Sequence, residues 1–376
     1  MDNLTHSLVG LAAAKAGLER LSPFATTVCV IAANAPDGDI LAAFGGSWFY
    51  LKHHRGITHS IVGTLAIGVM IPVVFWVIDK IVARWRVREP RVRLGGLMLA
   101  SLVLSLSHPL LDWTNSYGVR PFLPWSGQWF YGDLVFILDP FLWLSLGGAA
   151  FLLTAKTNRR VALWTLLALA LTSVVLLLPQ RASLNYPVLS RALWVLALVG
   201  IIAAYKSRTF RRWNSSVAVV ALALVVVYWG ALSILHRQAF YAAENISTRL
   251  ASERGEKLLR VAAMPVLANP LNWVCMTETD RAMYRFDLSL WEDNSVGQTR
   301  GSVARYAKPE GNDAALVERA SRDERAQILL DFARFPTTNV RRGCAEQTLV
   351  QFADLRFTEP GGRRRGNFAL EIPVER

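Results

Sequence analysis

Charged residues are scarce in this sequence: they make up 18% of its 376 residues, whereas hydrophobic residues make up 53%. That balance is too apolar for an ordinary soluble domain. The sequence also lacks the glycine-rich phosphate loop, the dinucleotide-binding fingerprint and the serine nucleophile elbow. It therefore gives no sign of nucleotide-dependent or serine-hydrolase chemistry.

The apolar residues gather in runs of about 20, the length that crosses a bilayer as a helix. Two shorter runs, 4–18 and 22–36, suit a shallow hairpin or the membrane interface as well as a full span. We therefore expect a polytopic α-helical membrane domain of six to eight helices over residues 1–235, followed by a small α+β extramembrane domain over residues 236–376. The longer runs lie at 60–82, 94–112, 134–154, 161–178, 191–205 and 216–235.

The formal net charge of +13 is not spread evenly. Residues 236–376 hold 21 Lys and Arg against 19 Asp and Glu, while residues 1–235 hold 20 against 9. The positive residues of the first part cluster in short loops, near 84–93, 156–160 and 206–212. This distribution indicates the membrane topology of the chain and not a groove that binds nucleic-acid phosphates. We expect membrane lipids, and not nucleic acid, as partners; protein partners stay unknown.

The three basic loops are cytoplasmic by the positive-inside rule. The loops between them, and everything after residue 235, then face outward. The same count brings the segment 37–59 and the C-terminal end of the 94–112 run to the outer face. These two places carry most of the histidines.

Histidine is rare, with six residues, yet five of them fall within the first 108 positions, near the ends of apolar runs. His108 and Asp112 are four residues apart, so a helix presents both on one face. Imidazoles and carboxylates at one depth of a membrane domain are ligands of zinc- or manganese-type cations. We predict a divalent-metal site, with zinc first and manganese as the alternative. The predicted ligands are His6, His54, His59, His108 and Asp112.

Further carboxylates lie at the same face. Asp37 and Asp39 form a Pro-Asp-Gly-Asp segment that reads either as part of the site or as a simple turn. Arg55 is an outer-face cation that could bind an anionic substrate group or lie solvated. We predict these three as catalytic residues. Asp133 and Asp139 are predicted to orient the ligands, because a carboxylate beside or within an apolar run is costly unless partnered.

Taken in order, the motifs resemble those of a bacterial family of inner-membrane, metal-dependent hydrolases, whose members are called LexA-regulated, membrane-bound hydrolases. The resemblance covers residues 1–140 and rests on the segments 2–8, 36–39, 54–60, 108–118 and 129–133, with the Asp-Pro pair at 139–140. It implies a metal-dependent hydrolase in the bacterial inner membrane, with its outer face in the periplasm. The residues that fall on the family's motif positions are His6, Asp37, Asp39, His54, His59, His108 and Asp112.

Two functions follow from this pattern. In the first, a metal-activated water attacks an ester, phosphoester or amide bond of a lipid or envelope substrate at the outer membrane surface. In the second, the protein is a non-catalytic, metal-stabilised transport or scaffold protein. A structural site is closed by four protein ligands, and seven candidates exceed that number. The sequence therefore favours the enzyme.

The tail is expected to hold an amphipathic helix at 238–260, a turn-rich entry near 268–273, and helical periodicity over 312–334. Strand-like alternation appears at 283–290 and 349–357, and a Gly-Gly turn at 361–362 precedes a further strand at 367–374.

The sequence has three cysteines. Cys29 lies in an apolar run and is expected to pack as a small hydrophobe. Cys275 and Cys344 lie in the tail, and in an oxidising periplasm we predict that they form a disulfide. Such a bridge would contribute on the order of 4 kcal/mol by chain-entropy reasoning. The alternative is two unrelated buried thiols in a cytoplasmic domain.

Overall fold

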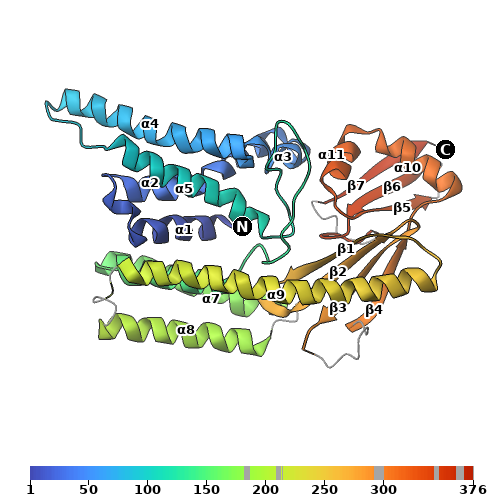
Figure 1. Cartoon of the computed structure of the whole chain (residues 1–376). Coiled ribbons are helices and arrows are strands. Elements are labelled where there is room, and N and C mark those ends of the chain that lie inside the picture. The colour runs from blue at the N-terminus through green and yellow to red at the C-terminus, as the bar shows by residue number, and fades with distance from the viewer. Residues whose placement is uncertain are drawn as a thin grey trace. The chain divides into compact units, whose positions relative to one another are not determined.

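The computed structural model describes residues 1–181, 187–208, 213, 215–291, 300–342, 347–360 and 368–375. Every predicted apolar run contains a helix (Figure 1), and the helices are α1 (Asn3–Ala16), α2 (Ala25–Asn34), α4 (Ile61–Trp85), α5 (Leu94–Trp113), α6 (Pro140–Thr154), α7 (Asn158–Arg181), α8 (Val188–Ser207) and α9 (Ser215–Glu253). Short helical turns lie between them: η1 (Leu18–Arg20), η2 (Ala35–Gly45), α3 (Ser47–His53) and η3 (Ile57–His59).

Six helical stretches among the described residues are long and apolar enough to cross a membrane. One of them, Ala25–Gly45, joins α2 to η2. Helices α1 and α6, with 14 and 15 residues, are shorter than the bilayer core requires. The predicted polytopic membrane domain is confirmed, with six candidate spans.

Polar residues set the starts of three of these helices. The side chains of Asp2, Ser60 and Asp139 each accept a hydrogen bond from a backbone N–H in the first turn of α1, α4 and α6, respectively. These are N-cap contacts, which satisfy donors that the helix itself leaves unpaired. In α6 a proline follows the cap at the first helical position, where its missing N–H costs nothing.

Small residues allow the first helices to pack closely. A Cβ added to Gly10 of α1 would lie 2.8 Å from the carbonyl oxygen of Cys29 in α2. A Cβ on Gly68 of α4 would lie 2.5 Å from Ser105 Oγ in α5. Close approach of this kind is a usual way for membrane helices to associate. Cys29 is fully buried in this packing, as the sequence predicted.

The chain divides into two compact units that interleave along the sequence. The membrane unit contains Met1–Gly38, Arg55–Ile234 and Pro265–Pro270. The C-terminal unit contains Asp39–His54, Leu235–Met264 and Leu271–Arg376. The short α3 therefore belongs with the C-terminal unit, where it packs against α11 (Glu324–Phe332).

Helix α9 differs from the prediction. The sequence predicted two helices, 216–235 and 238–260, whereas the structure has one helix of 39 residues. Its length is about 58 Å at 1.5 Å per residue. Neither glycine nor proline occurs between residues 231 and 253, so nothing interrupts the helix where its composition changes from apolar to polar. The helix ends at Glu253, and a strand occupies the last positions that we expected to be helical.

The C-terminal unit is α+β, as predicted. Its four-stranded sheet has the order β1-β2-β3-β4, and its three-stranded sheet has the order β5-β6-β7. The strands are β1 (Leu258–Val266), β2 (Asn269–Thr279), β3 (Ala282–Ser289), β4 (Arg300–Ala307), β5 (Pro336–Arg342), β6 (Gln347–Asp354) and β7 (Ala369–Glu375). Helices α10 (Gly311–Ser321) and α11 contact the three-stranded sheet.

The predicted strands correspond to β3, β6 and β7, and the predicted helical stretch 312–334 is the pair α10 and α11. The strands β1, β2, β4 and β5 were not predicted. In β1 and β2 the burial does not alternate, because three consecutive residues of each strand are buried. Such strands give no period-2 signal.

The four-stranded sheet is covered on both faces within this unit. Ala239, Ala243 and Ile246 of α9 pack with Trp273 and Phe286 on one side. Met264, Met276 and Met283 pack with Phe335 and Leu355 on the other. Cys275 is buried in the first of these cores. Cys344 and the Gly361-Gly362 turn lie outside the described residues, so the disulfide and the turn stay predictions.

Candidate metal centre

Four of the predicted site residues come together in the membrane unit: Asp37, His59, His108 and Asp112. One oxygen or ring nitrogen from each lies within 4.8 Å of the others. The two histidines and Asp112 are almost completely buried, and the Asp37 side chain is 13% exposed. Histidine nitrogens and carboxylate oxygens at this spacing could hold a divalent cation.

Three separate elements supply these side chains. Helix α5 presents His108 and Asp112 from its last two turns, on one face, as their spacing predicted. His59 is the last residue of η3, immediately before the N-cap of α4. Asp37 lies in η2, which continues α2 without a break in the helical backbone.

A glycine fixes the position of η3. A Cβ added to Gly63, in the first turn of α4, would lie 1.8 Å from the carbonyl oxygen of Ile57. Only glycine lets the backbone of η3 approach α4 this closely. The motif His-Arg-Gly-Ile-Thr-His-Ser-Ile-Val-Gly therefore ends on a residue that helps to place His59.

The rings of the two histidines are held through their Nδ1 atoms. His108 Nδ1 lies 2.7 Å from the carbonyl oxygen of Ala33, which can only accept, so Nδ1 is the donor. His59 Nδ1 lies 3.1 Å from Thr58 Oγ1. Nε2 of a neutral His108 thus presents a lone pair, and it lies 3.0 Å from His59 Nε2. A hydrogen bond from the distal ring nitrogen is the usual support of a metal-binding histidine.

The distances among the four side chains fit a cation. Asp37 Oδ1 lies 3.3 Å from His59 Nε2 and 3.4 Å from His108 Nε2. Asp112 Oδ2 lies 3.3 Å and 3.7 Å from the same two nitrogens. Ligands arranged tetrahedrally at about 2.0–2.1 Å from a zinc ion are separated by about 3.3–3.4 Å. A cation among these atoms would also offset the mutual repulsion of two lone pairs and two carboxylates.

Arg55 holds Asp112 and the loop that follows α5. Its Nε lies 3.0 Å from Asp112 Oδ2, and its Nη1 donates to Asn115 Oδ1 and to the carbonyl oxygen of Gly118, at 3.1 and 3.0 Å. The guanidinium also lies over the Tyr117 ring. Arg55 is buried and has a φ of 51°, a conformation that non-glycine residues adopt at a cost. Its contacts make it a positioning residue for Asp112; a contact with substrate stays a prediction.

His6 adjoins the group without being one of the four. Its Nε2 lies 3.3 Å from Asp112 Oδ1, and its ring stacks on that of His108 with centroids 3.8 Å apart. The N-terminal amino group of Met1 also contacts Asp112 Oδ1. His6 therefore supports both residues that α5 supplies. A direct ligand role for His6 stays a prediction.

His54 and Asp39 form a separate pair. His54 Nδ1 lies 3.0 Å from Asp39 Oδ1, and the His54 ring stacks on Tyr50. Both residues belong to the segment Asp39–His54 of the C-terminal unit. The four-residue group therefore contains Asp37, which the sequence assigned to catalysis, and not His54, which it assigned as a ligand. A ligand role for His54 and a catalytic role for Asp39 stay predictions.

The two aspartates predicted to orient the ligands differ in their surroundings. Asp133 is buried and has a φ of 52°. Asp139 caps α6 and accepts a hydrogen bond from the Tyr228 hydroxyl of α9 at 2.9 Å. The residue that sequence reasoning missed is Asn115, which binds Arg55 and receives the backbone N–H of Tyr117. It lies inside the quoted motif, but nothing in its spacing indicates that role.

Comparison with known proteins places the first part of the chain. Residues 1–182 match the family described as YdjM inner membrane protein. Residues 1–182 of the chain are thus similar to this family. The chain is also 28% identical over 155 residues to the uncharacterized protein YfhP of Bacillus subtilis (strain 168). That match covers 39% of this chain and 44% of YfhP, so the chain spans less than half the length of this relative. No solved structure matches the chain.

This match agrees with the predicted resemblance to a bacterial inner-membrane family, and the six candidate spans support a multi-pass membrane protein. All four residues of the group fall within the matched segment. Of the C-terminal unit, the segments Leu235–Met264 and Leu271–Arg376 lie outside it. The candidate site thus lies in the part of the chain that matches this family.

Proposed function

We propose that this protein is a membrane-bound, metal-dependent hydrolase that acts at the periplasmic face of the inner membrane. Its substrate would be an ester, phosphoester or amide of a lipid or envelope component. The observation that carries the proposal is the pair of buried Nε2 atoms 3.0 Å apart, with two carboxylates beside them and the His108 Nδ1 proton committed to a backbone carbonyl. A proton or a cation must lie between such groups.

Asp37, His59 and His108 are the proposed ligands, with Asp112 as the fourth or as a base beside them. When bound, a divalent cation would polarise the scissile group and lower the pKa of a water molecule toward about 7. Two histidines and one carboxylate with an open position are a ligand set of catalytic zinc sites. The second oxygen of Asp37, Oδ2, is buried and has no hydrogen-bond partner among the described residues, so it can accept a proton.

Asp112 decides between catalysis and a structural site. Four protein ligands would close a structural zinc site, and this number favours the non-catalytic alternative. However, Arg55 also binds Asp112 Oδ2, so less of the negative charge of this carboxylate is available to a cation. A ligand shared with a guanidinium is weaker, and this favours three firm ligands and an exchangeable position.

Elemental analysis and a lipid assay together test the proposal. The protein is purified without chelators, in wild-type form and as His108→Ala, and the metal content is measured. It is then incubated in vesicles made from a total bacterial lipid extract, and released products are analysed by mass spectrometry. Stoichiometric metal and product release, both lost in the variant, support the hydrolase. Absence of metal in the wild type overturns it, and metal without any product selects the structural alternative.

The proposed orientation has its own test. Lys156 lies in a basic loop between α6 and α7, and Gly127 lies in the loop between α5 and α6; both are exposed. Lys156→Cys and Gly127→Cys variants are labelled in intact cells with a membrane-impermeant thiol reagent, against the parent chain. We expect labelling at position 127 only, with position 156 reached after the cells are opened. The reverse pattern would place the site at the cytoplasmic face.

A further inference from the structure

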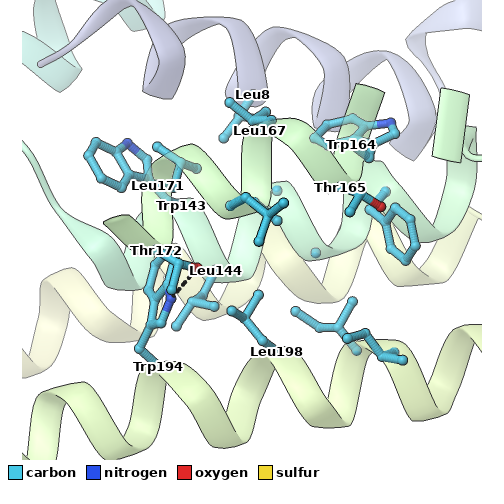
Figure 2. Close-up of a pocket in the computed structure, with 17 residues that line it drawn as sticks. Leu8, Trp143, Leu144, Trp164, Thr165, Leu167, Leu171, Thr172, Trp194 and Leu198 are labelled. Carbon is cyan, nitrogen blue, oxygen red and sulfur yellow. Dashed lines mark hydrogen bonds between the residues drawn. The ribbon is translucent and has the colours of Figure 1, made fainter. Parts of the chain in front are cut away.

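A cavity of about 230 Å³ lies within the membrane unit, between α6, α7 and α8. Leu8 of α1 also lines it. Figure 2 shows Trp143, Leu144, Leu171 and Trp194 directed into the same space. A cavity of about 150 Å³ lined by aliphatic and aromatic side chains already accepts benzene, so this one is large enough for a length of hydrocarbon.

The lining has the chemistry of a hydrocarbon site. None of the described residues that line the cavity carries a charge, and its polar side chains are those of threonine and tryptophan. Thr172 accepts a hydrogen bond from Trp194 Nε1 at 3.0 Å, so this hydroxyl is already engaged. Trp164 Nε1 donates to Thr154 Oγ1 at 2.9 Å. A polar ligand would find few partners here, whereas an aliphatic chain would bury its surface favourably.

The mouth of the cavity opens on faces that lipid covers. Leu169 of α7 and Ile202 of α8 both line the cavity, and they are 61% and 51% exposed. Both helices are candidate membrane spans, and few of their residues are buried within the protein. In an inner-membrane protein the hydrocarbon that contacts these faces is the acyl region of the bilayer. An acyl chain can therefore enter sideways, without leaving the membrane.

One residue links the cavity to the metal centre. Trp143 lines the cavity, and its indole Nε1 lies 3.2 Å from Thr5 Oγ1 and 3.3 Å from both carboxylate oxygens of Asp2. The residue after Thr5 is His6, which contacts Asp112. Leu8 lies two positions after His6 on the same helix, which corresponds to a rise of about 3 Å along the helix axis. The cavity thus begins about one helical turn from the residues that support the metal ligands.

We infer that this cavity binds an acyl chain of a membrane glycerophospholipid whose head group reaches the metal centre. The inference rests on the proposed function and narrows its substrate to a lipid with a long apolar chain. The chain lies among α6, α7 and α8, and α1 connects it to the ligands. The site then selects its substrate by hydrocarbon length and not only by head group.

A photoactivatable lipid tests this inference without requiring turnover. The probe is a phosphatidylglycerol with a diazirine at the end of one acyl chain, mixed into phosphatidylglycerol vesicles that contain the full-length protein. After irradiation, mass spectrometry locates the adducts. We expect adducts on the cavity residues Leu171 and Leu198, together with background adducts on the outward-facing Leu166, which is 65% exposed.

Two matched glycine variants provide the control. Gly147 lines the cavity, and a Cβ added there would meet only Leu8 Cδ1, at 3.7 Å, so Gly147→Leu fills the cavity without a clash at its Cβ. Gly200 of α8 does not line it, and a Cβ there meets nothing within 4 Å. Gly147→Leu should lose the adducts on Leu171 and Leu198 and keep those on Leu166. Gly200→Leu should behave as the wild type.

Metal content distinguishes a failure of the acyl-chain inference from a failure of the hydrolase proposal. If the wild type binds metal but the cavity residues gain no adducts, the acyl-chain inference is overturned and the hydrolase proposal stands. Unchanged adducts in Gly147→Leu overturn it as well, provided that the variant retains the wild-type metal content and so is folded. Absence of metal in every form overturns the hydrolase proposal itself.

Discussion

Each unit of this protein buries a carboxylate against an arginine, but the other groups around the two carboxylates differ. In the C-terminal unit, Glu256 Oε2 accepts hydrogen bonds from Thr279 Oγ1 and the Tyr284 hydroxyl, both at 2.7 Å. Its Oε1 accepts one from Arg305, also at 2.7 Å. In the membrane unit, Asp112 pairs with Arg55 and with the N-terminal amino group of Met1, and its other neighbours are imidazoles, two of which face each other through Nε2.

This difference distinguishes a buried carboxylate with a structural role from one at a candidate functional site. Burial alone would raise the pKa of Glu256, but the hydrogen bonds from Thr279, Arg305 and Tyr284 outweigh it and lower the pKa to about 2. Every oxygen of Glu256 is satisfied by the protein. Around Asp112, by contrast, Asp37 Oδ2 and His6 Nδ1 are buried without a hydrogen-bond partner among the described residues. Buried polar atoms that converge without hydrogen bonds to the protein are typical of a site that binds a ligand.

The largest expected effect is loss of metal on removing a ligand. His108→Ala deletes the nitrogen that faces both Asp37 and His59, so the bound metal should fall from stoichiometric to background. Loss of one ligand from a three- or four-ligand site removes most of its affinity. Inductively coupled plasma mass spectrometry of the purified protein measures this directly.

His53→Ala is the matched control. His53 is exposed, and its Nδ1 contacts the carbonyl oxygen of Phe49 in its own helix, α3. The variant should keep the full metal content. Equal loss of metal in both variants would show that metal binding reports the general integrity of the fold, and the four-residue group would lose its special status.

Arg55→Lys should give the next largest effect, on stability. Lysine cannot reproduce the planar fork that binds Asp112, Asn115 and Gly118 together. Disrupting a buried ion pair while one charge remains costs about 3–5 kcal/mol, and the lysine charge should recover only part of that. Thermal unfolding in detergent, followed by tryptophan fluorescence, should show a lower midpoint, and metal content should fall with it.

Arg88→Lys is the comparison for that measurement. Arg88 pairs with the buried Asp79 at 2.7 Å, but the backbone N–H groups of Arg91 and Val92 also bind this carboxylate. Asp79 therefore stays satisfied, and the midpoint should change little. An Arg55→Lys variant as stable as Arg88→Lys would mean that Arg55 does not hold Asp112 in solution.

Much of the fold and of the site could be predicted from the sequence, and the failures have physical causes. Apolar runs predicted the helices because hydrophobic length is a local property. His108 and Asp112 were placed together because their spacing matches one helical turn. The sequence does not show the positive φ at Arg55, so the direction in which the chain turns after His54 could not be predicted from it, and a ligand role for His54 stays a prediction.

Contacts between residues far apart in the sequence also could not be predicted. The Nδ1 bond from His108 to the Ala33 carbonyl joins residues 75 positions apart and involves a backbone atom that has no sequence signature. The strands β1 and β2 were missed because their buried residues do not alternate. Asp37 was found by its motif, but only the fold shows that it faces both histidines.

Glu256→Gln should produce a smaller effect that depends on pH. The folded-state pKa of about 2 lies below the ordinary value of 4.5, so the ionised carboxylate stabilises the C-terminal unit above pH 4.5. That contribution is lost as the pH falls toward 2. Hydrogen bonds to a charged group contribute about 1.5–3 kcal/mol, and the variant should be less stable by about this amount at neutral pH.

The check is a pair of denaturation curves at several pH values, with Glu359→Gln as control. Glu359 pairs with Arg285 on the surface and is 55% exposed, so its removal should change the unfolding free energy very little. The gap between wild type and Glu256→Gln should narrow below pH 4.5. A gap that stays constant down to pH 2 would contradict the assignment of Glu256 as an ionised structural group.

The smallest expected effect concerns Asp139, which the sequence assigned to the support of the metal ligands. In the structure its Oδ1 caps α6 and its Oδ2 accepts from the Tyr228 hydroxyl of α9. Both oxygens of Asp139 accept hydrogen bonds from the protein, so Asp139 resembles Glu256 and not Asp112 in this respect. Tyr228→Phe removes one donor to a buried oxygen, so it should lower the unfolding free energy by about 1–3 kcal/mol. Metal content, measured on the same sample, should stay at the wild-type level. If the metal is lost instead, Asp139 acts on the metal centre through the α6–α1 packing at Trp143, and the sequence-based role is the correct one.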